Sequence, residues 1–185
     1  NKLYVCNSCS SDYTTYYKNV VELNASTLAK NQDIEVVDDP VDVINAGSAI
    51  FILSMGIYAD KDKPATVQML KDGQISTIGN ATMMAYDAYN DQLYMINAPY
   101  GGDKEYKVYN LKNGQTTTFL NNPDIFSPYS LAVNPVNGDV FITAQVESAE
   151  YPGSASYNTD GKLYRYSSAG ILLGTYDCGV NPGTI

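Results

Sequence analysis

The residues of this chain that could take part in chemistry are tyrosines, carboxylates and three cysteines, because the sequence contains no histidine. Histidine is the usual general base near neutral pH and a common metal ligand. Catalysis would therefore have to use carboxylates, tyrosine, lysine or a cysteine without a histidine partner. The 17 tyrosines suggest binding instead, since a tyrosine offers a flat apolar face and a polar tip with little rotamer entropy to lose.

The cysteines include a C-x-x-C pair, Cys6 and Cys9, with Cys178 far away in the sequence. Such a pair can be a redox motif or half of a zinc site. A structural zinc normally takes four ligands, and a redox motif normally opens a helix, whereas this pair ends a predicted strand. We therefore expect free thiols or a local disulfide, with at least one thiol unpaired.

Carboxylates in predicted loops are the candidates for hydrolase or lyase chemistry, which uses two acids that approach each other. The spacing does not indicate which of them would pair. Short oxygen-rich stretches at 60–62 and 137–139 do not match the spaced pattern of a calcium-binding loop. No metal or cofactor is predicted, although Ca²⁺ stays open as an ion that such stretches could hold. The candidate acids are Asp60, Asp62, Asp103, Glu147 and Glu150.

The charge balance excludes two classes of partner. Only 11 lysines and arginines face 20 acidic residues, so the net charge is −9 and the isoelectric point is near 4.3. Nucleic-acid binding needs clustered basic residues, and an acidic surface disfavours anionic lipid. The densest apolar stretch, 49–53, is far shorter than the roughly 20 residues of a transmembrane helix. We expect neither a nucleic-acid partner nor a transmembrane segment.

The elements that must position these residues follow from a degenerate repeat. Gly73 and Gly114 are 41 residues apart, and Asp87 and Asn134 are 47 apart, each pair at equivalent places in the pattern. A period of this size built from short strands is typical of propeller blades. We predict an all-β fold of about four blades, each with four antiparallel strands, the first blade lacking its innermost strand. The predicted strands are 2–6, 18–23 and 33–38; 41–45, 49–53, 66–70 and 74–78; 82–87, 92–96, 106–111 and 115–120; and 129–134, 139–143, 162–167 and 170–176.

The chain is predicted to be a single propeller domain, or part of one, over residues 1–185. Its blades span 1–38, 41–78, 82–120 and 129–176, and 181–185 would begin a further strand. Turn residues support this division, since Asp72-Gly73 and Asn113-Gly114 predict tight hairpins. Residues 24–30 are the best helical candidate, at most one or two turns. Alternation predicts a core of Ala85, Leu93, Met95, Leu131, Val133, Val140 and Ile142.

The segment Ser127-Pro128-Tyr129-Ser130-Leu131-Ala132-Val133-Asn134-Pro135-Val136-Asn137-Gly138-Asp139-Val140-Phe141-Ile142-Thr143 resembles the blade motif of YVTN/NHL-type (YncE-like) β-propellers. More narrowly it is similar to propeller proteins of gut Bacteroidetes, and 161–166 and 179–183 fit the same family. The resemblance implies a periplasmic or outer-membrane surface location with a lipid anchor outside this chain. It also implies a ring of six to eight blades, although a closed four-bladed ring stays open. Exposed terminal blades would then favour self-association.

Every predicted loop between the second and third strands of a blade carries tyrosine. Such loops emerge at one mouth of a propeller, where a rigid scaffold positions binding residues. We predict a non-enzymatic binding or scaffold module that recognises a glycan or a protein there. The alternatives are a lyase or hydrolase that uses channel carboxylates, and a structural fragment whose site lies on other blades. The predicted ligand-binding residues are Tyr13, Tyr16, Tyr58, Tyr100, Asp103, Tyr129, Tyr151 and Tyr157.

Overall fold

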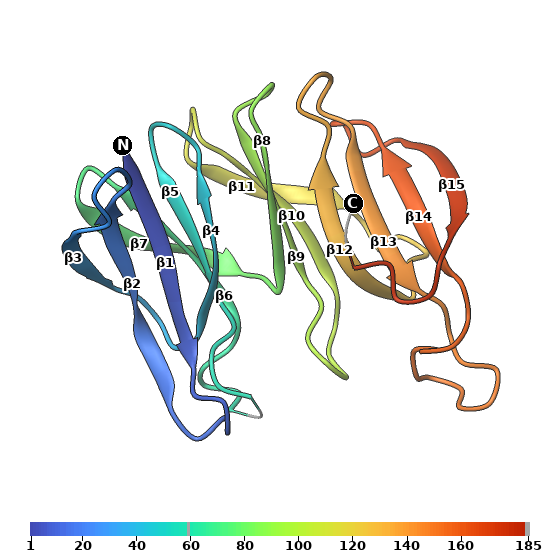
Figure 1. The fold of residues 1–185 in the computed structure, drawn as a ribbon. Coiled ribbons are helices and arrows are strands. Elements are labelled where there is room, and N and C mark those ends of the chain that lie inside the picture. Colours follow the sequence, from blue (N-terminus) through green and yellow to red (C-terminus); the bar gives the residue numbers. More distant parts are fainter. Residues whose placement is uncertain (59, 184–185) are drawn as a thin grey trace. The chain divides into compact units, whose positions relative to one another are not determined.

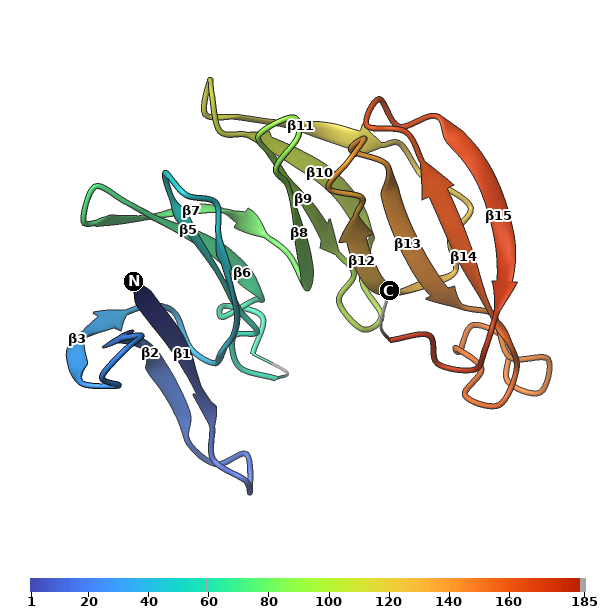
Figure 2. The same cartoon turned by 45° about the horizontal axis from the view of Figure 1, so that its top comes forward.

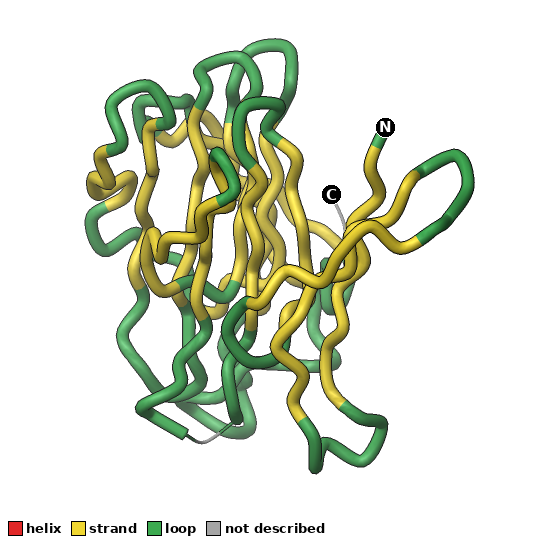
Figure 3. The backbone as a smooth tube through the Cα atoms, turned by 90° about the vertical axis from the view of Figure 1, so that its left-hand side faces the viewer, coloured by secondary structure: helices red, strands yellow, loops and turns green. Residues whose placement is uncertain are grey.

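The computed structural model describes residues 1–58 and 60–183 of the chain. The described residues contain strands and loops and no helix, as Figure 3 shows by its colouring. The chain divides into two compact units, Asn1–Thr82 and Met83–Ile185, each with two antiparallel sheets. Among the described residues, no helix is long and apolar enough to cross a membrane. The predicted all-β class is confirmed.

The first unit holds one three-stranded and one four-stranded sheet (Figure 1). Strands follow one another in space in the order of the sequence, so each neighbouring pair is an antiparallel hairpin. The first sheet has the three strands predicted for the first blade. That the missing strand is the innermost one stays a prediction. The strands are β1 (Lys2–Cys9), β2 (Tyr16–Asn24), β3 (Lys30–Glu35), β4 (Pro40–Asn45), β5 (Ile50–Ser54), β6 (Thr66–Lys71) and β7 (Gln74–Asn80).

The second unit holds two four-stranded sheets with the same order of strands. Figure 2 shows the innermost strands of these sheets, β8 and β12, side by side, and the two strands are in contact. The strands are β8 (Met83–Asp87), β9 (Gln92–Asn97), β10 (Glu105–Asn110), β11 (Gln115–Leu120), β12 (Ser127–Val133), β13 (Val140–Gln145), β14 (Gly161–Tyr166) and β15 (Leu172–Cys178).

Each unit has a hydrophobic core between its two sheets. In the first unit Val20, Ile34 and Ile52 form the centre of the core, with Val36 and Ile50. In the second unit the core contains side chains from the second, third and fourth strand positions of the blades and from the β11–β12 linker, which contributes Ile125. Its members are Tyr94, Ile96, Tyr106, Leu120, Ile125, Val140, Ile142, Ala144 and Tyr166.

Most predicted core residues are buried. Ala85, Leu93, Met95, Val140 and Ile142 are all at most 8% exposed. Leu131 and Val133 are only partly buried and pack against the core from β12.

Three local predictions need correction. The last strand of the first sheet was expected at 33–38 but lies at 30–35. Beyond its end, Val36 and Asp39 still donate backbone hydrogen bonds to Lys18 and Tyr17 of β2. Residues 24–30 form a turn in which the Asn24 side chain accepts hydrogen bonds from the backbone of Ser26 and Thr27. Residues 181–183 are not a strand, and 184–185 lie outside the described residues.

Because tyrosines are buried in the second unit, we expect the free energy of unfolding to fall at alkaline pH. Burial, with a smaller effect of Asp87, raises the pKa of Tyr94 to about 12, and burial also raises the pKa of Tyr106. In the unfolded chain these phenols ionise near pH 10. We therefore expect full stability below about pH 9 and a fall between about pH 10 and 12, because only the unfolded state loses protons there.

The test is the urea midpoint measured from pH 8 to 11, with Tyr94→Phe as the comparison. The variant lacks one ionisable phenol, so its midpoint should depend less on pH. An identical slope in both proteins would assign the alkaline loss to other groups.

Candidate functional site

Long loops join the second and third strands of each four-stranded sheet, and β1 to β2 in the three-stranded sheet. They span 10–15 and 55–65 in the first unit, and 98–104 and 146–160 in the second. Within each unit both long loops leave the sheets at the same end, as Figure 1 shows. The opposite end carries short turns, such as the two-residue turn Asp72-Gly73, in which both residues have positive φ. Each unit therefore has one end that can present side chains to a partner.

The loop at 10–15 presents Tyr13 at the tip of an ordered turn. Tyr13 has a φ of 57° and is 72% exposed. The Asp12 carboxylate holds the turn, accepting hydrogen bonds from the Ser10 hydroxyl (2.6 Å) and the Thr14 hydroxyl (2.8 Å). These bonds lower the pKa of Asp12. Tyr16 is different, because it is the first residue of β2, pairs with Cys9 and is half-buried.

The loop at 55–65 presents Tyr58, which is 81% exposed. Its base is closed by a hydrogen bond from the backbone of Ile57 to the Lys63 carbonyl (3.0 Å). Gly56 makes this closure possible, because its φ is +71° and a Cβ there would lie 2.0 Å from the same carbonyl oxygen. The close backbone approach at Gly56 therefore positions the residues that follow it.

In the second unit, Tyr100 stands on a turn in which the Gly102 amide donates to the Pro99 carbonyl (3.1 Å). Gly101 occupies the third turn position with a φ of 69°, which a non-glycine residue rarely adopts. The turn leaves the Tyr100 side chain 97% exposed. Asp103 follows on the same loop and is also exposed.

The loop at 146–160 presents Tyr151 and Tyr157, which are 63% and 71% exposed. Its polar side chains bind its own backbone: the Glu147 carboxylate accepts from the Gly153 amide (2.6 Å), and the Ser148 hydroxyl accepts from the Tyr151 amide (3.1 Å). The loop is therefore held in shape internally while its aromatic rings face solvent.

Tyr129 lies on β12 rather than on a loop. It stands in a bulge of the β12–β13 pairing, and Gly183 approaches its ring so closely that a Cβ there would lie 3.1 Å from Cε1. Tyr129 is 41% exposed, less than the loop tyrosines. The predicted residues thus divide between the two units: Tyr13, Tyr16 and Tyr58 lie in the first, and Tyr100, Asp103, Tyr129, Tyr151 and Tyr157 in the second.

A cavity of about 490 Å³ opens beside the loop that carries Tyr100. It lies between residues 102–106 and the β11–β12 linker, which supplies Asn122, Pro123 and Ile125. Sequence reasoning selected Asp103 but missed the other lining residues. No local pattern in the sequence indicates the others, because the linker and the start of β10 come together only in the folded chain.

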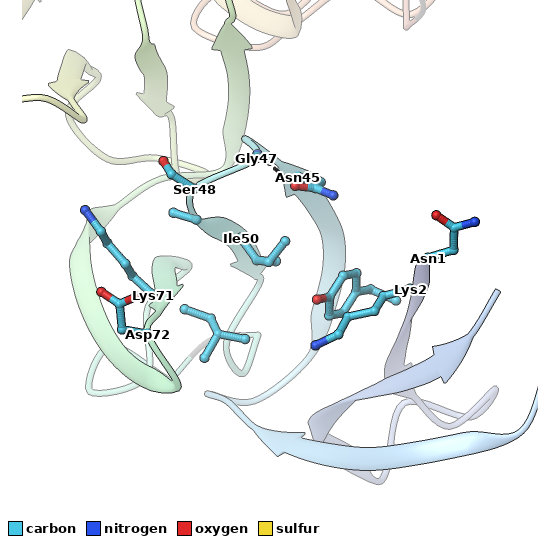
Figure 4. A pocket seen from close by; sticks show the side chains of 11 residues that line it. Asn1, Lys2, Asn45, Gly47, Ser48, Ile50, Lys71 and Asp72 are labelled. Atoms are coloured by element: carbon cyan, nitrogen blue, oxygen red, sulfur yellow. Dashed lines mark hydrogen bonds between the residues drawn. The ribbon is translucent and has the colours of Figure 1, made fainter.

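A second concave region lies at the short-turn end of the first unit (Figure 4). This cavity of about 380 Å³ has Ile50 at its floor and Ser48 and Lys71 at its rim. An adjoining cavity of about 340 Å³ shares Lys2 and contains the buried Glu22.

The polar groups deepest in this second region are already paired with one another. Burial alone would raise the pKa of Glu22, but hydrogen bonds from Lys2 (3.0 Å), Gln32 (3.2 Å) and Asn31 (3.1 Å) outweigh it and hold the pKa below its ordinary value. The bonded Glu22 carboxylate in turn raises the pKa of Lys2. This hydrogen-bond network links β1, β2 and β3. It stabilises the first sheet, and no ligand is needed to satisfy its polar groups.

Two of the acids considered for catalysis accept hydrogen bonds from backbone amides of their own loops. Asp60 accepts a hydrogen bond from the Asp62 amide (3.0 Å), and Glu147 holds Gly153 as described above. Asp139 pairs with the Arg165 guanidinium, which joins β14 to the start of β13. Among the described residues, no group of three or more histidine, cysteine or acidic side chains is placed to hold a metal ion.

The three cysteines are free thiols in the structure. Cys6 lies within β1 opposite Val20, and Cys9 lies opposite Tyr16 after a bulge. Burial, followed by the nearby Asp42 charge, raises the pKa of Cys6, which disfavours the reactive thiolate. Of the two expected alternatives, free thiols or a local disulfide, the structure has free thiols.

Comparison with known proteins defines the class of fold. The structure resembles TolB from Acinetobacter baumannii, with a TM-score of 0.58 and 12% identity over 95% of this chain and 40% of that one. It also resembles the β-propeller domain of the Trilobed protease from Pyrococcus furiosus, with a TM-score of 0.54 and 13% identity over 75% of this chain and 42% of that one. For Kuenenia stuttgartiensis hydrazine synthase the TM-score is 0.63, with 12% identity over 96% of this chain and 51% of that one.

The four sheets are therefore propeller blades, and the chain spans about two-fifths to one-half of the length of these solved structures. At such low identity the likeness concerns the fold alone. No protein-family model matches the sequence, and no curated protein sequence matches it. The three similar structures carry different functions, so the function of this chain has to be argued from its own loops.

Proposed function

We propose that this chain is a non-enzymatic binding module that recognises a glycan or a protein through the long loops of its blades. One observation carries the proposal: the loop tyrosines Tyr13, Tyr58, Tyr100, Tyr151 and Tyr157 are 63–97% exposed rather than packed over the blade edges. An exposed tyrosine ring can bury a large area against a ligand. It loses little conformational entropy when it does so, because its side chain has only two rotatable torsions.

The internal hydrogen bonds of the loops support the same function. Asp12, Ser148 and Glu147 bind the backbone of their own loops, so the tyrosines are displayed on ordered turns. A preorganised loop pays less conformational entropy when a ligand binds. Catalysis by paired acids has no comparable support, since the candidate acids Asp60 and Glu147 serve as turn caps.

The sequence resemblance adds two further expectations to this proposal. A periplasmic or cell-surface location suits a module that binds glycans or proteins, and a larger ring would bring further loops to the binding end. Self-association through terminal blades remains part of the same proposal, because strands with one unpaired edge can pair with another chain.

Replacement of loop tyrosines tests the proposal. Purified protein is screened on a glycan array and a peptide array, and the strongest ligand is titrated. We expect Tyr100→Ala and Tyr157→Ala each to weaken binding about tenfold, since one well-used aromatic contact contributes roughly 0.5–1.5 kcal/mol beyond its buried area.

The matched control is Tyr89→Ala. Tyr89 is 66% exposed and lies in the same unit, but it belongs to the short turn between β8 and β9 at the other end of the sheet. Its replacement should leave affinity unchanged. Equal losses in all three variants, or no loss in any of them, would contradict binding through the long loops.

A further inference from the structure

The outermost strand of the last sheet exposes apolar side chains along an unpaired edge. β15 pairs with β14 on one side, and no strand in the described part of the chain pairs with its other side (Figure 1). Ile171, just before the strand, is 64% exposed, and Leu172, Leu173 and Tyr176 within it are 48–51% exposed. We call these four residues, together with the free backbone beside them, the β15 edge. A free edge lined by apolar side chains is a template for pairing with another strand.

The corresponding strands of the other three sheets show that this exposure is specific to β15. β3, β7 and β11 are also the last strands of their sheets, and each lacks a strand neighbour on one side in the described structure. Every exposed residue of these three strands is polar, with lysine and acidic residues in β3 and a run of threonines at 116–118 in β11. Polar and charged residues protect an edge strand from pairing. β15 therefore departs from a pattern that the rest of the repeat keeps.

The exposed apolar side chains of β15 lie on both faces of its sheet. Leu172 lies opposite Tyr166, which belongs to the core between the two sheets of the second unit, so Leu172 is on that face. Tyr176 lies opposite Leu163, three residues before Tyr166, and is on the other face because successive side chains of a strand alternate. A partner packed on one face would cover only one of these side chains. A strand added beyond β15 would cover both.

Charge favours a second copy of this chain as the source of the added strand. The one charged residue of β15, Asp177, is bound by the Lys162 ammonium group from β14, so the β15 edge is a neutral strip. The whole chain has a net charge of −9, so two copies repel each other through the rest of their surfaces. Two such chains meet with the least repulsion at their neutral strips. A basic partner would gain more from the acidic surface than from this strip.

The order of residues along β15 also suits pairing with itself. Leu172 and Leu173 begin the strand, and Tyr176 lies near its end. Antiparallel strands related by a two-fold axis place the beginning of each strand beside the end of the other, so the leucines of one copy lie near the tyrosine of the second copy. Cross-strand pairs of aliphatic and aromatic side chains stabilise antiparallel sheets.

We infer that two copies of this chain form a two-fold dimer by antiparallel pairing of β15 with β15, which joins their last sheets into one continuous sheet. The inference rests on the part of the proposed function that expects self-association through a terminal blade, and it names the strand. The loop at 146–160 precedes β14, so it lies at the end of the sheet where β15 finishes. Antiparallel pairing turns these two ends in opposite directions. The dimer would therefore present its loop tyrosines to two separate ligands.

Sedimentation velocity of the whole chain over a range of concentrations measures the dimer, and hydrogen exchange followed by mass spectrometry locates it. We expect a dimer whose formation slows amide exchange in residues 172–178 as the concentration rises, because outer amides of β15 become paired. Leu173→Lys should raise the dimer dissociation constant about tenfold or more, because each dimer loses two leucines and buries two ammonium groups. Thr117→Lys, on the exposed part of β11, is the matched control and should dimerise normally. Ile171→Lys repeats the test at the most exposed of the four residues.

The outcomes separate this inference from the proposed function. A dimer that is unchanged in Leu173→Lys and Ile171→Lys, but weakened in Val5→Lys on the exposed part of β1, would overturn the assignment to β15 and keep self-association. A chain that stays monomeric up to about 1 mM would overturn both, and would leave the β15 edge for a strand of another protein. Neither result bears on ligand binding, which the loop-tyrosine variants test separately. Weaker dimers in both β15 variants, with unchanged far-UV circular dichroism and protection confined to β15, would establish the interface.

Discussion

Gly56→Ala is expected to lower the free energy of unfolding of the first unit by about 2–5 kcal/mol. A left-handed backbone costs a residue with a side chain roughly 1–2 kcal/mol, and forcing extra atoms into a packed place costs about 1–3 kcal/mol more. The new Cβ would lie 2.0 Å from the Lys63 carbonyl oxygen and 2.8 Å from that of Pro64. Both atoms are backbone, so no side chain can swing away to relieve the overlap.

Gly73→Ala separates the two costs in the same unit. Gly73 has a φ of +77°, close to the +71° of Gly56, but a Cβ at Gly73 would meet no atom within 4 Å. We expect a loss of only about 1 kcal/mol for Gly73→Ala. Urea unfolding of both variants measures the difference. Equal losses would show that the loop at 55–65 relaxes freely and that Gly56 does not hold it.

Asp87→Ala is expected to destabilise the second unit by about 3–5 kcal/mol. The Asp87 side chain is fully buried and accepts hydrogen bonds from the Tyr89 amide (2.9 Å), the Asn90 amide (3.1 Å) and the Asn90 side chain (2.7 Å). Its removal leaves these three donors without their acceptor in a turn where Asn90 is half-buried and the Tyr89 side chain is exposed, and a donor left unpaired away from water costs roughly 1–3 kcal/mol. Gly138 of the next blade packs against the Asp87 carboxylate, and a Cβ at Gly138 would lie 2.9 Å from Oδ2 of Asp87.

The repeat provides a matched comparison for Asp87. Asn134 occupies the equivalent place in the next blade, where it is half-buried and its side chain accepts one hydrogen bond, from the Val136 amide (2.9 Å). Asn134→Ala should cost about 1 kcal/mol, the usual net value of one hydrogen bond. Chemical unfolding followed by tyrosine fluorescence gives both values. A cost at Asn134 as large as that at Asp87 would mean that burial does not control the energy of this turn.

Strand positions and blade order could be predicted from the sequence because each depends on neighbouring residues. Alternating apolar residues predicted strands at 92–96 and 139–143, and these begin within one residue of the observed starts of β9 and β13. Asp72-Gly73 formed the predicted two-residue turn between Lys71 and Gln74. Asn113-Gly114 did not, because Asn110 pairs with Gln115 and its side chain accepts from the Lys112 amide, which makes a longer turn.

The candidate site could be predicted only in part, since it depends on contacts between distant segments. The sequence predicted that Tyr58, Tyr100 and Tyr157 lie in loops. It did not predict how exposed their side chains are, because that depends on the conformation of each turn. The cavity beside Asp103 was not predictable, because it exists only where the linker with Asn122 crosses the start of β10. Whether the tyrosines of the two units meet at one mouth stays a prediction.

The contrast between the two ends of each sheet has a consequence for how such a protein can change. An insertion in a long loop costs little, because the entropy lost on closing a loop grows only slowly with loop length. A two-residue turn tolerates no such insertion, because its length fixes the register of the two strands that it joins. Mutations at 55–65 or 146–160 that avoid Gly56 and the turn caps can therefore accumulate without loss of the fold. The long loops and the short turns that fix the strand register therefore lie at opposite ends of each sheet, so sequence changes in the loops leave the strand pairing unchanged.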